Sequence, residues 1–199
     1  MKVSREQAAR NREKVVDTAS RLFRARGVEA VGVGEVMHAC GLTHGGFYNQ
    51  FPSKDALAAE ACALSLANSA KGWRGIVADA GESATEAVST SYLSKANRDA
   101  PETGCALVSL GPEAARHGGD LAAAFRAGLE ELTAILEQAS PVCSREEALA
   151  RIAQLVGTMV LARGVGDEAL SDEIMAATRK ALRLPEPSLA FCGTSRDPL

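Results

Sequence analysis

The stretch GLTHGGFYNQFPSKDAL, residues 41–57, determines how the rest of this chain is interpreted. Two adjacent glycines, Gly45 and Gly46, are costly inside a helix, at about 1 kcal/mol each relative to alanine. The aromatic and amide side chains that follow them do not form the pattern of a buried core. We therefore expect the backbone to approach another surface here, with Tyr48 and Asn49 directed outward.

The composition favours an all-α fold. The chain has 199 residues, which is enough for one or two domains with a buried core. Alanine and leucine are abundant, whereas aromatic residues make up only 4% of the sequence. No convincing alternation of apolar and polar residues, which would indicate a strand, is found. We expect about nine helices and no sheet.

The charge is unevenly distributed along the chain. The net charge is −3, but residues 1–26 hold eight basic and three acidic side chains. A basic end on an acidic body indicates contact with nucleic acid or with a membrane surface. The alternative is an ordinary solvated helix face.

Several other classes of protein are disfavoured. The N-terminal stretch MKVSREQAAR lacks the apolar core of a signal peptide, and the longest apolar run, IAQLVGTMVLA, is too short to span a bilayer. We therefore expect a cytoplasmic protein with no membrane partner. No nucleophile–base pair or phosphate-binding loop indicates an enzyme. No metal site, cofactor or disulfide framework is expected, because the five cysteines form no CxxC or Cys/His cluster: Cys40, Cys62, Cys105, Cys143 and Cys192.

Apolar residues at helical spacing, together with turn residues, predict the order of the helices. The first helix is expected to begin with a capping box at Ser4 and Gln7 and to end at Gly27. The second short helix of the central stretch is expected to be capped by Thr43, and the long helix after it by Ser53. Further helices are expected at 33–40, 44–50, 54–73, 83–98 and 103–117 (kinked or split at Gly111-Pro112). Apolar stripes over residues 121–136, 149–160 and 170–181 indicate the last three helices.

The two short helices at 33–40 and 44–50, joined by a Gly-Leu-Thr turn, predict a helix-turn-helix motif. In this motif the second helix lies in the major groove of DNA. The paired glycines then allow the backbone to approach DNA closely. The hydroxyl of Tyr48 is suited to a phosphate and the amide of Asn49 to an adenine edge, while Lys54 can reach a phosphate from the next helix.

The same stretch resembles the signature of the tetracycline-repressor (TetR) family of bacterial transcription regulators. The match covers about residues 9–69 and includes LFRARG at the end of the first helix, the helix-turn-helix at about 32–51, and FPSKDAL. The resemblance implies a homodimer that binds a double-stranded DNA operator through residues 9–69. It also implies a helical effector-binding and dimerisation domain at 70–184 and a flexible tail at 185–199. By position, the family's DNA contacts fall on Thr43, His44, Gly45, Tyr48, Asn49 and Lys54.

The chain departs from the family pattern within the motif. Val31 and Gly32 stand where the family often has Ser or Thr, and one phosphate contact is therefore expected to be lost. Gly34 stands where a basic or polar residue is common, and His44 where Lys or Arg is frequent. We expect modest affinity, a changed base preference, or more reliance on Arg10, Arg12 and Lys54.

The resemblance implies that helices at 144–164 and 167–183 pair with those of a second copy in a four-helix bundle. Their apolar stripes fit this arrangement, and they also fit the core of a monomer. A two-fold dimer places its two DNA-reading helices ~34 Å apart and reads a palindrome. The unknown effector, a small molecule or an electrophile, would bind among the middle helices. Four residues there are candidates for lining its pocket or for ordinary core packing: Trp73, Tyr92, Phe125 and Met159.

Cys105 is expected in the first turn of a helix, where the helix dipole stabilises a thiolate. The stretch PETGCALVSLGPEAAR is similar to a TetR branch typified by the repressor of N-ethylmaleimide reductase. The resemblance implies that Cys105 senses electrophiles or oxidants. Cys143 and Cys62 are candidates for a resolving partner. The alternative is a small buried residue, and Glu102 opposes a thiolate. His117 is expected at the surface.

Three functions are therefore compared. The leading hypothesis is a DNA-binding transcriptional regulator, a repressor that releases a palindromic operator on binding a small ligand or on thiol modification. The alternative is a helical dimeric module that binds a ligand or a protein and has lost DNA binding. An enzyme is the third class. A steep fall of DNA affinity with salt separates the first hypothesis from the second.

Overall fold

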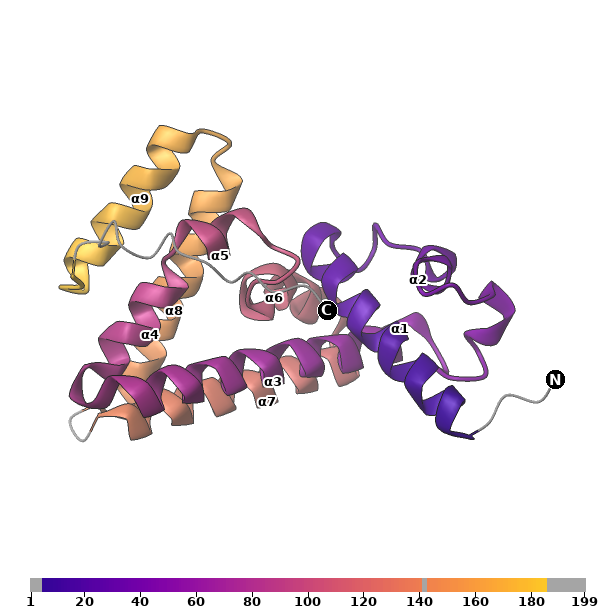
Figure 1. Ribbon diagram of the computed structural model, residues 1–199. Coiled ribbons are helices and arrows are strands. Elements are labelled where there is room, and N and C mark those ends of the chain that lie inside the picture. The colour runs from indigo at the N-terminus through magenta and orange to yellow at the C-terminus, as the bar shows by residue number, and fades with distance from the viewer. Residues whose placement is uncertain (1–4, 141–142, 186–199) are drawn as a thin grey trace, which may run out of the picture.

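The computed structural model describes residues 5–140 and 143–185, and within them the chain is all-α, as predicted (Figure 1). No strand occurs in these residues. Nine α-helices and two short 3-10 helices follow one another in the described part of the chain: α1 (Arg5–Arg26), α2 (Val33–Ala39), η1 (His44–Gly46), α3 (Lys54–Ala80), η2 (Gly81–Ser83), α4 (Ala84–Tyr92), α5 (Lys95–Asp99), α6 (Ala106–His117), α7 (Gly119–Ala139), α8 (Arg145–Gly164) and α9 (Glu168–Ala181).

The number of α-helices agrees with the prediction only because two differences cancel: one predicted α-helix is absent, and another is divided in two. The helix predicted at 44–50 is instead the single 3-10 turn η1, and the hydroxyl of Thr43 makes no capping hydrogen bond. The helix predicted at 83–98 is divided into α4 and α5. The division falls at Ser94, because its hydroxyl accepts a hydrogen bond from the backbone of Asn97 and so begins a new helix.

The N-terminal unit is formed by α1, α2, η1 and the beginning of α3, at one end of the molecule (Figure 1). Its core is dry and built from side chains with 0–1% exposure, among them Phe23, Val36, Met37, Phe47 and Phe51. Phe47 and Phe51 stack with their ring centroids 5.5 Å apart. Both phenylalanines therefore face the core of the N-terminal unit.

The helix α3 extends beyond its predicted end near Trp73 and reaches Ala80. Gly72 and Gly75 weaken the helical signal in the sequence, since each glycine costs about 1 kcal/mol inside a helix. In the structure α7 lies beside α3 over much of its length, and this packing outweighs the local cost (Figure 1). The long helix therefore joins the N-terminal unit to the rest of the chain. Its start is as predicted, since the hydroxyl of Ser53 accepts from the backbone of Ala56.

The helix α6 is continuous through Pro112, so the predicted split does not occur. A proline removes one intrahelical hydrogen bond, but α6 packs against α1, α3, α7 and α8, and these contacts hold it together. This helix is therefore the part of the second domain that touches the N-terminal unit most directly.

The last two helices, α8 and α9, pack against each other and begin with strong caps. Ser144 and Glu147 form a capping box at the start of α8, and Asp167 caps α9 by accepting from the backbone of Leu170. Among the residues that the structure covers, none of the helices combines the length and the apolar character that crossing a bilayer demands. The predicted cap at Ser4 and the predicted tail from residue 186 onward lie outside the described residues.

Candidate nucleic-acid interface

The turn between α2 and η1 depends on Gly41, whose φ of 68° lies in the left-handed region. The amide of Gly41 donates to the carbonyl of His38, and the amide of Leu42 donates to the carbonyl of Met37, both over 2.9 Å. This pair of hydrogen bonds is the Schellman motif, which ends a helix sharply and favours glycine at this position. The sequence analysis identified this turn correctly.

Five of the residues predicted to contact DNA are exposed, and together we call them the motif face: Thr43, His44, Gly45, Tyr48 and Asn49. Tyr48 is 66% exposed, the most exposed large apolar or aromatic side chain among the described residues. A Cβ added at Gly45 would meet no atom within 4 Å, so this position is open on the outer side. Lys54, the sixth predicted contact, is half-buried at the start of α3.

The motif face is held from beneath by aromatic contacts. The ring of Tyr48 lies edge-on to the buried Phe47, with centroids 5.1 Å apart, and edge-on to His44 at 6.4 Å. The guanidinium of Arg12 lies 4.6 Å from the centroid of Phe51. Tyr48 therefore contacts the buried core through Phe47 while most of its side chain stays exposed.

The arginines expected to compensate for lost phosphate contacts are engaged in ion pairs. Arg10 pairs with Glu6, one turn earlier on α1, over 2.6 Å, and Arg12 pairs with Glu60 on α3, also over 2.6 Å. Arg12 therefore joins α1 to α3. Of the three cations named from sequence, Lys54 is the one without a carboxylate partner among the described residues, since its Nζ donates to the backbone carbonyl of Glu29 over 3.4 Å.

The departures from the family pattern have a structural account. Val31 is fully buried, so a hydroxyl there would need a partner in the core. Gly32 is the N-cap of α2 and supplies no side chain to it. A Cβ added at Gly34 would lie 3.5 Å from Cδ2 of the His44 imidazole. That distance is an ordinary van der Waals contact, so an alanine at position 34 would pack beside the imidazole.

The residues proposed for an effector pocket pack in the core. Trp73 and Tyr92 are buried and meet edge-on, with centroids 6.1 Å apart, and Met159 is fully buried. Phe125 is half-buried at the edge of the same core. None of these four residues lines a groove of about 790 Å³ that runs between α1, α5, α6, α8 and the start of α9. Their assignment to an effector pocket stays a prediction.

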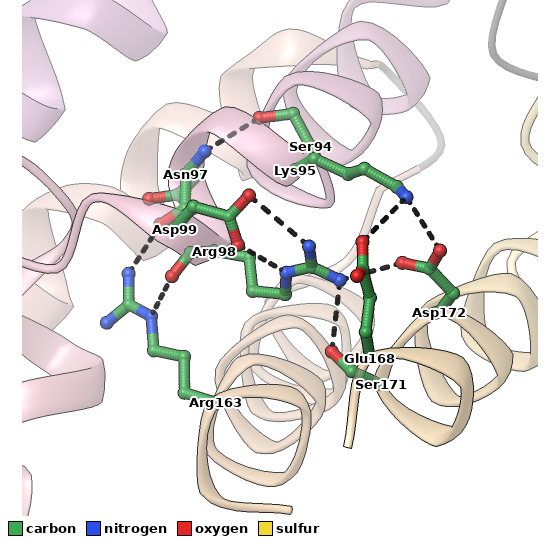
Figure 2. Close-up of polar contacts among 9 residues, drawn as sticks. All are labelled: Ser94, Lys95, Asn97, Arg98, Asp99, Arg163, Glu168, Ser171 and Asp172. Carbon is green, nitrogen blue, oxygen red and sulfur yellow. Dashed lines mark hydrogen bonds and ion pairs between the residues drawn. The ribbon is translucent and has the colours of Figure 1, made fainter. Parts of the chain in front are cut away.

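The short helix α5 is fastened to α8 and α9 by arginines (Figure 2). Arg98 pairs with Asp172 over 2.7 Å and donates to the hydroxyl of Ser171 over 3.2 Å. Arg163, on α8, donates to the backbone carbonyls of Asn97 and Arg98 over 2.6 and 3.1 Å. The segment that precedes Cys105 is therefore held firmly against the last two helices.

Cys105 is the N-cap of α6 and not a residue of its first turn, and it is only 7% exposed. Burial raises the pKa of the Cys105 thiol, and the Leu107 amide and the hydroxyls of Tyr92 and Ser69 act in the opposite direction. The amide of Leu107 favours the thiolate, but burial outweighs it and raises the pKa, so the resting thiol is protonated. The four cysteines in the described residues are free thiols, and Cys192 lies outside them.

Two residues that connect the domains were missed from the sequence. Arg24, near the end of α1, donates from Nη1 to the carbonyl of Gly104 over 2.6 Å, directly before Cys105. His117, expected at the surface, is only 18% exposed and faces carboxylates of the N-terminal unit. Neither contact has a local sequence signal, because the partners lie far apart along the chain.

Comparison with known proteins supports the motif directly. The family model described as "Bacterial regulatory proteins, tetR family" matches residues 15–61. The chain is 35% identical over 65 residues to the HTH-type transcriptional regulator AcrR of Shigella flexneri, covering 33% of this chain and 30% of AcrR. It is 39% identical over 51 residues to YerO of Bacillus subtilis, an uncharacterized HTH-type transcriptional regulator, covering 26% of this chain and 18% of YerO. The chain thus matches less than a third of the length of these curated relatives.

The whole fold is shared with solved structures. The reduced form of NemR from E. coli superimposes with a TM-score of 0.70 at 19% identity, covering 86% of this chain and 96% of NemR. A TetR-family transcriptional regulator from Cytophaga hutchinsonii superimposes with a TM-score of 0.72 at 18% identity, covering 92% and 97% of the two chains. At these identities the likeness establishes the fold alone.

An N-terminal helix-turn-helix unit joined through a long helix to a second helical domain defines a class of two-domain, all-α regulatory proteins. Residues 15–61 match the DNA-binding part of the TetR family, and the whole chain shares the fold of solved TetR-family regulators.

Proposed function

We propose that this chain is a DNA-binding transcriptional regulator, a repressor that releases a palindromic operator in response to an effector. The observation that carries the proposal is the motif face, which presents hydroxyl, imidazole and amide groups on an open surface fixed by the buried Phe47. Backbone at Gly45 is free to approach DNA, and Lys54 has no carboxylate partner among the described residues. Operator binding places the protein in the cytoplasm of a bacterial cell.

The repressor acts as a homodimer through α8 and α9. The apolar residues of these helices lie on two faces. One face packs in the core of the chain, where Ile152, Leu155 and Met159 of α8 are buried. Exposed apolar side chains remain on the other face, at Leu149, Val160, Leu161 and Leu170. Eleven residues separate Leu149 from Val160, which is close to three helical turns and sets them on one side of α8. Such a patch on two packed helices fits a second copy of the same pair.

Two routes for release of the operator are proposed. In the first, a reversible small ligand binds in the second domain. In the second, an electrophile or an oxidant modifies Cys105, and Arg24 transmits the change to α1 because it holds the carbonyl of Gly104. A helical module that has lost DNA binding is the alternative to both, and it predicts no specific duplex and no dependence on Lys54.

The proposal predicts a steep salt dependence of DNA binding to which Lys54 contributes. We expect the slope of log affinity against log salt concentration to become shallower by about 1 in Lys54→Gln, because each phosphate contact releases counterions. The measurement is fluorescence anisotropy with a duplex recovered by selection from random sequences, between 50 and 200 mM salt, a range in which six to ten phosphate contacts lose about 10³–10⁵ in affinity.

Lys71→Gln is the matched control for this measurement. Lys71 is exposed on the same helix, 17 residues away, which is about 25 Å along the helix axis. The slope should be unchanged in this variant. Wild-type protein that enriches no duplex, or a slope that is the same with and without Lys54, would contradict DNA binding through this face.

The proposed thiol route predicts slow alkylation of Cys105 that accelerates with pH. Because burial raises the pKa of this thiol, N-ethylmaleimide should react slowly at pH 7 and faster at pH 8.5, where more thiolate is present. The half-exposed Cys143 should react first, although burial raises its pKa as well. Cys62 should stay unmodified, since burial raises its pKa to about 12. Mass spectrometry of digested protein gives each rate.

Release of DNA should follow the modification of Cys105 and not that of Cys143. We expect Cys143→Ser to release the operator duplex on alkylation and Cys105→Ser to retain it. If both variants retain DNA after Cys105 has been fully alkylated in the first, the thiol route is wrong and the reversible ligand remains.

A further inference from the structure

His117 occupies the contact between the two domains. It is the last residue of α6, and both nitrogens of its ring face carboxylates. Its Nε2 lies 3.0 Å from Oε1 of Glu29 and 3.4 Å from Oε2 of Glu113, and its Nδ1 lies 3.3 Å from Oδ1 of Asp55. Glu29 belongs to the connection between α1 and α2, and Asp55 to the first turn of α3. One imidazole of the second domain thus touches two segments of the DNA-binding unit.

The geometry suits the imidazolium form. A neutral imidazole has one N–H and can donate from one nitrogen, whereas the imidazolium donates from both. Because carboxylates lie on both sides of the ring, only the protonated ring can donate from Nδ1 to Asp55 and from Nε2 to a glutamate at the same time. The other charged group close to this cluster on α6 is Arg116, which pairs with Glu113 over 3.0 Å.

The same cluster touches Lys54, the cation proposed to contact a DNA phosphate. The Nζ of Lys54 donates to the backbone carbonyl of Glu29, and Asp55 is the next residue in the chain. His117 therefore contacts two neighbours of Lys54. One is Glu29, whose backbone carbonyl accepts the hydrogen bond of the lysine, and the other is Asp55, the next residue in the chain.

We propose that His117 is a positioning residue for DNA contact, and that the proton it carries sets the affinity for DNA. The inference rests on the proposed function. The protonated ring offsets the negative charges of Glu29 and Asp55, which are 73% and 69% exposed beside Lys54, and holds both segments in place. Loss of the proton leaves these carboxylates uncompensated near the approaching phosphates, which lowers affinity.

The first test compares the pH dependence of duplex binding in wild type and His117→Gln. Anisotropy with the selected duplex is measured at pH 6 and pH 8 at one ionic strength, the range in which histidine side chains change charge. We expect the ratio of the two affinities to be about three- to fivefold larger in wild type than in the variant, the size of partly exposed ion pairs. His38 and His44 are present in both proteins, so any contribution they make is common to the two measurements.

Glu29→Gln supplies an independent variant, because it removes a carboxylate from an exposed side chain and leaves the backbone carbonyl that Lys54 uses. We expect it to bind DNA more tightly than wild type at pH 8 and nearly equally at pH 6. Helical circular dichroism and the melting temperature establish that each variant is folded.

Three outcomes separate the possibilities. A larger affinity ratio in wild type than in His117→Gln, with the expected gain in Glu29→Gln, supports the proposal. Equal ratios in wild type and His117→Gln, or an equal loss of affinity at both pH values, show a structural role only and overturn it. Wild type that binds no duplex at either pH refutes the proposed function itself, which is a different result from binding without the pH effect.

Discussion

Replacing Gly128 by alanine is expected to destabilise the protein by about 2 kcal/mol, although alanine is the better helix former. Gly128 lies in α7 where this helix meets Leu66 of α3. A Cβ at this position would lie 2.3 Å from Cδ1, 2.6 Å from Cβ and 2.9 Å from Cγ of Leu66. A change of rotamer cannot clear the Cβ of Leu66, so the two helices must separate.

The magnitude follows from two opposing effects. Overpacking a tight core costs up to about 3 kcal/mol. The gain in helix propensity from glycine to alanine offsets about 1 kcal/mol of that cost. For a chain of this size, the net loss corresponds to a melting temperature lower by roughly 4–8 °C. Urea unfolding monitored by circular dichroism, at one protein concentration because of the proposed dimer, measures the free energy.

Gly75→Ala is the matched control, since it makes the same substitution in the interior of α3. No atom lies within 4 Å of a Cβ added there. This variant should gain up to about 1 kcal/mol, so that the two alanine variants differ by about 3 kcal/mol. In the double variant Leu66→Ala/Gly128→Ala, the losses should be partly less than additive, because the truncation removes the contacts with Cδ1 and Cγ and leaves the 2.6 Å contact with Cβ. Additive losses, or a Gly128→Ala protein as stable as wild type, would show that α3 and α7 do not approach so closely.

The N-terminal unit was the most predictable part of the fold, because its signals are local. Gly41 requires a left-handed backbone and marks the turn, Ser53 caps α3, and Phe47 and Phe51 show the spacing of an inward pair. Each of these depends on residues within about one helical turn. The prediction failed where one local signal was weak, since Thr43 precedes a 3-10 turn and not a capped α-helix.

Helix lengths in the second domain were less predictable, because packing decides them. Gly72, Gly75 and Pro112 read as helix breakers in the sequence, yet α3 and α6 continue through them under contacts with helices distant in the chain. Gly128 could not be predicted either. Nothing in the adjacent sequence indicates that Leu66 packs against this position and leaves no room for a side chain.

The residues of the candidate site also differ in how far local sequence signals predict them. The six predicted DNA contacts follow from the motif and lie at its surface or edge, whereas Arg24 and His117 become visible only when the domains are assembled. Their partners, Gly104, Glu29 and Asp55, are between 62 and 88 residues away. Charge pairing over such separations leaves no pattern in a single sequence, so the links between the domains had to come from the structure.

Tyr48→Phe is expected to weaken operator binding about tenfold or more, with no change in stability. A hydrogen bond to a charged group contributes roughly 1.5–3 kcal/mol, and 1.4 kcal/mol corresponds to a tenfold change in affinity. The ring is 66% exposed and rests on Phe47, so removing its hydroxyl leaves no hole in the core. Anisotropy titration of the selected duplex measures the affinity, and thermal unfolding establishes that the fold is unchanged.

The choice of duplex distinguishes what Tyr48 contacts. A phosphate contact carries no sequence information, so Tyr48→Phe should weaken binding to the selected duplex and to a scrambled duplex by similar factors. Asn49→Ala is the comparison, because a lost contact to a base edge should weaken binding to the selected duplex only. If Tyr48→Phe binds both duplexes as wild type does while Tyr48→Ala fails, the ring contributes by packing on His44 and Phe47 and the hydroxyl contacts nothing. If both Tyr48 variants bind as wild type does, the motif face lies away from the DNA, and the position of Lys54 beside His117 no longer bears on operator binding.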